Sequence, residues 1–310
     1  MRVSCTNSRP LLVFGKKLNF ATTYCRLNNK KIQKVEQPYI NLYIKVTDWC
    51  NASCPFCEYR GLGRAFNIYK LFESIKEINK TIRINKVSFT GGEPTTSGNL
   101  LLYLIKEIRE LIPEAFITVN TNGYRLHHLL SADVNSIALS RHHYDDKRND
   151  NIFKINALSA EALRSIDPSK IHLSCNLIKG EIDSANEVEK YLSFASSCNI
   201  HDVGFVGLMP VNDYCKTNYV DFNKLSFDKK HIIKYKTYRR TTVCKCSNYL
   251  YIKAGAMTLF YNRCVLKPDD TVGSLVFDGQ HLRSGFNQTI IYQGEKHERR
   301  NETAIRRSWV

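Results

Sequence analysis

The sequence lacks any apolar run approaching the roughly eighteen residues that a membrane-spanning helix needs. Its first 35 residues contain no acidic side chain, and their one apolar run, Leu11–Phe14, is too short for a secretory signal. No internal repeat, low-complexity tract or recognised nucleic-acid motif is present. These absences predict a soluble, cytoplasmic protein without a membrane partner. The basic N-terminus leaves an organelle transit peptide as an alternative, although it is rich in lysine more than in arginine and serine.

Acidic residues are scarce relative to basic ones, which gives the 310-residue chain a formal net charge of +16. This excess favours an anionic partner such as a phosphorylated small molecule, a nucleotide or a nucleic acid. The basic residues are spread along the chain, so a lysine-rich solvated surface is the alternative. Nucleic acid is therefore a partner that the sequence allows and does not favour.

Cysteine is plentiful and grouped. Of eleven cysteines, three stand at positions 50, 54 and 57 and three more at positions 244, 246 and 264. An odd count in such groups indicates metal ligation in a reducing compartment more than disulfides. A structural zinc site would need a fourth protein ligand near Cys50, Cys54 and Cys57, whereas three thiolates suffice for a four-iron cluster with one open iron. The spacing favours the cluster over zinc.

A second motif follows about 35 residues later, where the apolar run Lys86–Thr90 ends in Gly91-Gly92-Glu93-Pro94. Adjacent glycines let the backbone approach a ligand closely, and a carboxylate beside them can receive an ammonium group. CxxxCxxC followed by GGE resembles the signature of the radical S-adenosylmethionine (radical SAM) superfamily. The resemblance covers roughly residues 38–212.

Apolar periodicity predicts an alternation of strands and helices through this region. The expected strands are 39–46, 86–90, 116–120, 136–140, 171–177 and 203–208, and the expected helices are 67–79, 99–111, 127–131, 157–165 and 184–198. Six strands with intervening helices predict a parallel α/β fold, and the resemblance implies a partial (β/α)6 barrel. We expect an N-terminal arm over 1–38, the core over 39–212 and a third region over 213–310.

The third region holds the second cysteine group around a predicted β-hairpin. Cys244 and Cys246 precede the strand-like run 248–253, and Cys264 follows a second run, 256–261. This cysteine-rich β-hairpin extension resembles the Twitch, or shortened SPASM, extension, which implies a second iron–sulfur cluster. A zinc knuckle or unligated cysteines are the alternatives.

The resemblance also assigns roles in the first site. Cys50, Cys54 and Cys57 would hold a [4Fe–4S] cluster, whose open iron would bind S-adenosylmethionine. Gly92 and Glu93, with Gly91 beside them, would hold the methionine ammonium. The remaining cofactor contacts would be Phe56 near the adenine, Met209 on the adenine side, Thr121 at a strand end and Ser140 near the ribose or carboxylate.

The loop Ser140–Asp146 combines a serine, an arginine, two histidines and two carboxylates at the carboxyl end of a predicted strand. His142 and His143 are candidate catalytic residues, because such a group could bind an anionic substrate or move a proton at neutral pH. A polar loop that caps the next helix is the alternative.

The layout further resembles the cyclase family that begins molybdenum-cofactor synthesis from GTP, but the substrate-binding positions differ. Trp49 and Ser88 stand where arginines are expected, and His172 stands where a lysine is expected. Without these cationic side chains the chain would lack contacts to a triphosphate. We therefore expect it to keep the scaffold of the cyclase family but not to catalyse the reaction of GTP.

The leading hypothesis is therefore a radical SAM enzyme that abstracts hydrogen from a small, anionic biosynthetic substrate. The reductant would be a flavodoxin or a ferredoxin. Peptide maturation and RNA modification are alternatives, and the short N-terminal arm favours a small molecule over a peptide. A non-enzymatic zinc- or cluster-binding interaction protein is the remaining alternative.

Overall fold

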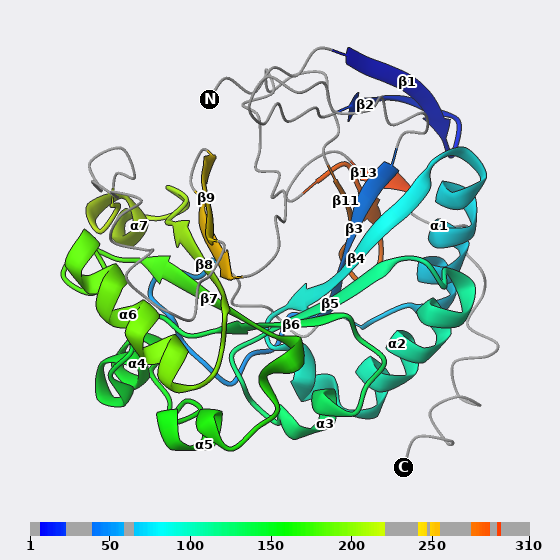
Figure 1. The fold of residues 1–310 in the computed structure, drawn as a ribbon. Helices are drawn as coiled ribbons and strands as arrows, with labels where there is room; N and C mark the ends of the chain where they lie inside the picture. The colour runs from blue at the N-terminus through cyan, green and yellow to red at the C-terminus, as the bar shows by residue number, and fades with distance from the viewer. Residues whose placement is uncertain are drawn as a thin grey trace.

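The computed structural model describes residues 7–22, 39–58, 65–220, 241–246, 249–254, 274–285 and 290–292. Its centre is a curved sheet of parallel strands with helices on the outer side (Figure 1). The parallel strands are β3 (Tyr39–Thr47), β4 (Arg83–Gly91), β5 (Phe116–Thr121), β6 (Ser136–Ser140), β7 (Ile171–Leu177) and β8 (Asp202–Gly207). They are neighbours in sequence order, and the sheet does not close, which confirms the predicted α/β class with an open barrel.

Helices follow each of these strands, and the longest of them bury one apolar stripe each. They are α1 (Ile68–Thr81), α2 (Asn99–Leu111), α3 (His127–Leu130), α4 (Asp146–Phe153), α5 (Ala160–Arg164), α6 (Ala185–Ser197) and α7 (Asp213–Thr217), with short 3-10 turns η1 (Pro94–Ser97) and η2 (Pro168–Lys170). In α1 the side chains of Leu71, Ile75 and Ile78 are fully buried at helical spacing. Asn67 accepts a hydrogen bond from the backbone of Lys70 and starts this helix.

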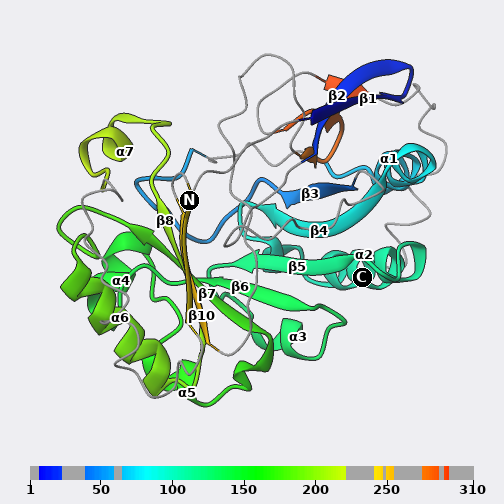
Figure 2. The ribbon, with the colours of Figure 1, turned by 45° about the horizontal axis from the view of Figure 1, so that its top comes forward.

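The two faces of the sheet differ in polarity. Along β7, Ile171, Leu173, Cys175 and Leu177 are buried in the core shared with the helices. The alternate residues are half-buried and polar, and they point to the inner, concave face because successive strand side chains point to opposite sides. The sheet therefore has an apolar outer face, which the helices cover (Figure 2), and a polar inner face.

Strands distant in sequence extend both edges of this sheet. Next to β3 lie β11 (Leu275–Phe277, parallel to it), β12 (Leu282–Arg283) and β13 (Ile290–Tyr292). On the other edge, β10 (Tyr249–Ala254) pairs antiparallel with β8, and β9 (Thr241–Cys246) pairs with β10. The sheet therefore has eleven described strands, in the order β13-β12-β11-β3-β4-β5-β6-β7-β8-β10-β9.

The N-terminal arm contains a hairpin of β1 (Asn7–Val13) and β2 (Lys16–Thr22), which forms a separate two-stranded sheet. The hairpin contacts the main body, because Phe14 stacks on Tyr292 and Thr81 donates a hydrogen bond to the carbonyl of Leu12. Within the described part of the chain, no helix has both the length and the apolarity to cross a bilayer.

Candidate active site

The cysteine loop begins where β3 ends and is tied to the end of β4. Gly92 donates its backbone N–H to the carbonyl of Thr47 at 2.7 Å, and Glu93 donates to the carbonyl of Trp49 at 2.8 Å. The approach is so close that a Cβ on Gly92 would lie 2.1 Å from the Trp49 carbonyl oxygen, and one on Gly91 2.2 Å from that of Thr47. Both positions require glycine because the backbone of the cysteine loop passes over them.

The three thiols of this loop are half-buried and close enough to influence one another. Burial, together with the charges of the Cys57 and Cys50 thiolates, raises the pKa of Cys54 to about 12. Burial also raises the pKa of Cys50, although the N–H of Ala52, 3.4 Å from its Sγ, acts in the opposite direction. A cationic group is needed to hold three such sulfurs as thiolates together.

This donor set fits an iron–sulfur cluster, which soft thiolates hold at separate corners. Across the described ranges, no three His, Cys, Asp or Glu side chains surround one point closely enough to hold a single metal ion.

Glu93 lies at the carboxyl end of β4 and is 2% exposed. Its Oε1 accepts hydrogen bonds from the backbone and hydroxyl of Thr95 and, at 2.7 Å, from the hydroxyl of Thr121. Its Oε2 accepts the backbone N–H of Asn122, also at 2.7 Å. Burial raises the pKa of Glu93 and these donors lower it. The carboxylate thus joins the ends of β4 and β5.

Asn122 follows β5 and reaches the cysteine loop. Its Nδ2 donates to Asn51 Oδ1 at 2.8 Å and lies 4.0 Å from the Sγ of Cys50. The sequence places Thr121-Asn122-Gly123 at a strand end, but the contact with the cysteine loop depends on the spatial alignment of β3 and β5, which no local pattern encodes.

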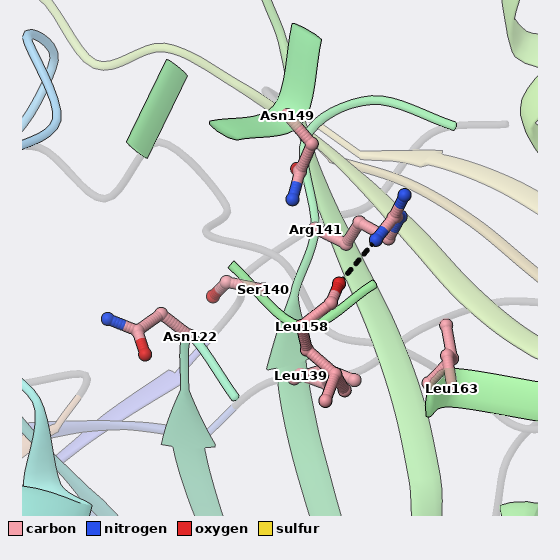
Figure 3. Close-up of a pocket in the computed structure, with 7 residues that line it drawn as sticks. All are labelled: Asn122, Leu139, Ser140, Arg141, Asn149, Leu158 and Leu163. Carbon is pink, nitrogen blue, oxygen red and sulfur yellow. Dashed lines mark hydrogen bonds between the residues drawn. The ribbon is translucent and has the colours of Figure 1, made fainter. Parts of the chain in front are cut away.

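A small hollow lies beside this point, at the carboxyl ends of β5 and β6 (Figure 3). It is lined by Asn122, Leu139, Ser140, Arg141, Asn149, Leu158 and Leu163. Asn122 and Ser140 therefore lie on one hollow next to the cysteine loop. The guanidinium of Arg141 is buried, donates to the carbonyl of Leu158 at 2.7 Å and pairs with Asp146.

His142 is buried between aromatic rings. It lies edge-on to Phe56 of the cysteine loop and stacks on Phe153, with ring centroids 5.0 Å and 4.8 Å away. Its Nδ1 accepts the backbone N–H of Asn176 at 3.0 Å, and burial lowers its pKa to about 3. Because Phe153 also accepts the backbone N–H of Ser53, the loop Cys50–Cys57 rests on this aromatic stack.

His143 points away from that stack. Its Nδ1 accepts the N–H of Asp145, and its Nε2 is buried without a hydrogen bond, 3.9 Å from Glu181 Oε2. Burial, with the nearby Arg148 charge, lowers the pKa of His143 to about 4. Both histidines are therefore neutral at pH 7, and their predicted catalytic role stays a prediction.

The segment after β8 supplies contacts with the cysteine loop that the sequence did not predict. Asn212 donates from Nδ2 to the carbonyl of Pro55 at 3.1 Å, and the thiol of Cys215 in α7 donates to the carbonyl of Phe56. Met209, in the same segment, is exposed.

The second cysteine group is described only in part. Cys244 and Cys246 lie in β9, opposite Tyr251 and Tyr249 of β10. The predicted run 256–261 and Cys264 lie outside the described residues, so the second cluster stays a prediction.

Comparison with known proteins decides the family. The family model described as the radical SAM superfamily matches residues 44–190, which include the cysteine loop, Gly91–Glu93 and the hollow. Residues 44–190 are a radical SAM domain. Proteins of this superfamily use a [4Fe–4S] cluster and S-adenosylmethionine, which confirms the cofactors predicted for the first site.

Two relatives show how far the similarity extends. A Methanocaldococcus jannaschii protein assigned as a glycyl-radical enzyme activating enzyme is 24% identical over 61% of this chain and 76% of its own length. The GTP 3',8-cyclase of Petrotoga mobilis is 28% identical over 62% of this chain and 64% of its own.

Among solved structures, Streptococcus suis SuiB bound to S-adenosylmethionine is similar with a TM-score of 0.48 and 17% identity. The similarity covers 66% of this radical SAM chain and 46% of SuiB. The chain thus spans less than two thirds of the cyclase and about half of SuiB.

Proposed function

We propose that this chain is a radical SAM enzyme that abstracts a hydrogen atom from a small polar substrate carrying an anionic group. The observation that carries the proposal is the convergence of the cysteine loop, Gly91–Glu93 and the Asn122–Ser140 hollow at one edge of the sheet, above its polar concave face. Ligands of open α/β sheets bind at the carboxyl ends of the strands.

In this proposal Cys50, Cys54 and Cys57 are the cluster ligands. When bound, the reduced cluster and S-adenosylmethionine supply a 5′-deoxyadenosyl radical, the species that abstracts hydrogen. Glu93 holds the ends of β4 and β5 in place, while the backbone of Gly91–Gly92 and the side chain of Ser140 border the space for S-adenosylmethionine. Thr121 fixes Glu93, Phe56 of the loop contacts α7 through its carbonyl, and Phe56 and Met209 would lie on the adenine side of the cofactor. A flavodoxin or ferredoxin would deliver the electron.

The substrate would lie on the concave face, below that edge. His172 Nδ1 and Asp202 Oδ1 are 2.7 Å apart on adjacent strands, and Asn120 donates to the hydroxyl of Ser88 at 2.8 Å. These pairs place hydrogen-bonding groups across β4, β5, β7 and β8, which suits a polar molecule more than an apolar one.

Two lysines give this face its affinity for an anionic group. Lys45 lies near the carboxyl end of β3 and Lys86 near the amino end of β4, and both alternate with buried core residues of their strands. Lys86 Nζ lies 5.6 Å from the centre of the Phe116 ring, and burial lowers its pKa while the Asp202 charge raises it. A carboxylate or phosphate group of a substrate would be attracted to these two ammonium groups.

The test is anaerobic reconstitution with iron and sulfide, followed by reduction and a count of 5′-deoxyadenosine formed from S-adenosylmethionine. We expect about four irons from the first site, and about eight in total if Cys244, Cys246 and Cys264 hold a second cluster. Cys54→Ser should abolish 5′-deoxyadenosine formation, since a neutral hydroxyl does not replace the thiolate. Cys198→Ser, a buried thiol of the outer layer, is the matched control and should keep it. Normal turnover by Cys54→Ser would refute the assignment.

A further inference from the structure

Asn122 is the side chain through which the end of β5 contacts the first cysteine. Its Nδ2 carries two hydrogens and has two neighbours, Asn51 Oδ1 at 2.8 Å and Cys50 Sγ at 4.0 Å. The side chain is buried, with 8% of its surface exposed, so these contacts are sheltered from water.

The orientation of this amide is fixed by its other atoms. Asn122 Oδ1 accepts the backbone N–H of Tyr124 at 3.0 Å, which turns the oxygen into the tight turn and leaves the NH₂ group facing the sulfur. The backbone N–H of Asn122 donates to Glu93 Oε2, and Glu93 is itself held by Thr95 and Thr121. A rotated amide would lose the bonds to Tyr124 and Asn51 together, so the NH₂ group stays directed at Cys50.

N–H donors directed at a ligand thiolate raise the reduction potential of an iron–sulfur cluster. The reduced state of an iron–sulfur cluster carries one more electron, and a donor directed at a ligand sulfur stabilises the added negative charge. Cys50 already receives the N–H of Ala52 at 3.4 Å. The Asn122 amide is a second donor on the same sulfur, and it comes from the far strand β5 rather than from the cysteine loop itself.

We propose that Asn122 is a positioning residue that holds the Cys50–Asn51 end of the loop and raises the reduction potential of the cluster through its amide N–H. This inference rests on the proposed function, because it takes Cys50 as a cluster ligand. It gives the Glu93 carboxylate a purpose beyond the binding of S-adenosylmethionine: Glu93 fixes Asn122, and Asn122 acts on Cys50.

The test is the midpoint potential of the reconstituted cluster in the full chain, measured by anaerobic spectroelectrochemistry without S-adenosylmethionine. Asn122→Ala removes the donor, and Asn122→Asp keeps the oxygen that accepts from Tyr124 but replaces the NH₂ group by a second, negatively charged oxygen. We expect both variants to have a more negative potential than the wild type, with Asn122→Asp the lower of the two.

Asn135→Ala is the matched control. Asn135 also bonds through its amide, to the backbone of Ile117 and to Arg109, but it precedes β6 at the opposite end of the sheet. The midpoint potential of the cluster in Asn135→Ala should equal that in the wild type. A wild-type potential in both Asn122 variants with the cluster retained would overturn the inference.

The two hypotheses fail in different ways. If the wild type assembles no cluster, the proposed function fails before Asn122 is tested. If the wild type and Asn135→Ala assemble it but both Asn122 variants lose iron while keeping the wild-type far-UV circular dichroism, the holding role of Asn122 is supported directly.

Discussion

At the scale of single residues, burial decides the protonation of the histidine pair after β6. His142 lies between Phe56 and Phe153, and His143 is enclosed next to Arg148. Both lose water that would solvate an imidazolium, so both are neutral where a free histidine is partly charged. His142 packs against Phe56 of the cysteine loop, and His143 accepts the N–H of Asp145, the N-cap residue of α4, while the catalytic role of the pair stays a prediction.

This neutrality predicts a stability that falls in mild acid. Below pH 6.5 the unfolded chain binds protons at both histidines, whereas the folded chain, with pKa values of about 3 and about 4, does not. The free energy of unfolding should therefore decrease by roughly 1.4 kcal/mol per pH unit for each histidine between pH 6 and pH 4.5. Urea denaturation of the iron-free chain at several pH values measures this slope.

His142→Phe keeps a ring in the stack and should make that slope shallower, although its stability at pH 7 will be lower because the N–H of Asn176 loses its acceptor. His128→Phe, at an exposed position of α3, is the control and should keep the wild-type slope. An unchanged slope in His142→Phe would show that His142 does not contribute to the loss of stability in mild acid.

At the scale of elements, the sequence predicted the helices and strands whose apolar residues repeat with a strong period. The helix 99–111 and the strands 136–140 and 171–177 have the bounds predicted for them, because their apolar residues repeat with one clear period. Helix α4 was missed because Ile152 and Phe153 are its only large apolar residues. β11 was missed because three residues are too few to show a period.

The residues of the candidate site likewise fall into those that the sequence could predict and those that it could not. The cysteines and glycines could be predicted because their chemistry depends on spacing along the chain. Asn122 and the aromatic support of Phe56 could not, since each depends on which strand ends meet in space. The close passage of the cysteine loop over Gly92 belongs to this second kind.

Gly92→Ala tests that passage. An added Cβ would lie 2.1 Å from the carbonyl oxygen of Trp49, so either the loop or the end of β4 must move. We expect a loss of about 3 kcal/mol or more in the free energy of unfolding, together with weak iron retention. Gly98→Ala, where a Cβ meets nothing within 4 Å but the backbone has φ of 53° and ψ of −122°, should cost about 1–2 kcal/mol and retain iron. Equal losses in the two variants would show that the passage over Gly92 is not what requires glycine.

At the scale of the whole molecule, the C-terminal region joins the core sheet at both edges. β11 pairs in parallel with β3, the strand that leads into the cysteine loop, and β10 pairs with β8. Phe277 of β11 is fully buried in the main core and meets Phe66 edge-on at 5.6 Å. We therefore expect the region 274–285 to unfold together with the core rather than as a separate domain.

Phe277→Ala measures this coupling. Removing a buried phenylalanine should lower the free energy of unfolding of the entire core by about 3–5 kcal/mol. The transition should shift to lower urea as a whole, with far-UV circular dichroism and tyrosine fluorescence still changing at the same concentration. Leu12→Ala, at a position of β1 that is 60% exposed, should change the midpoint little. A new early transition in Phe277→Ala that leaves the main one in place would instead show that the C-terminal strands fold independently, and that β3 keeps its position without β11.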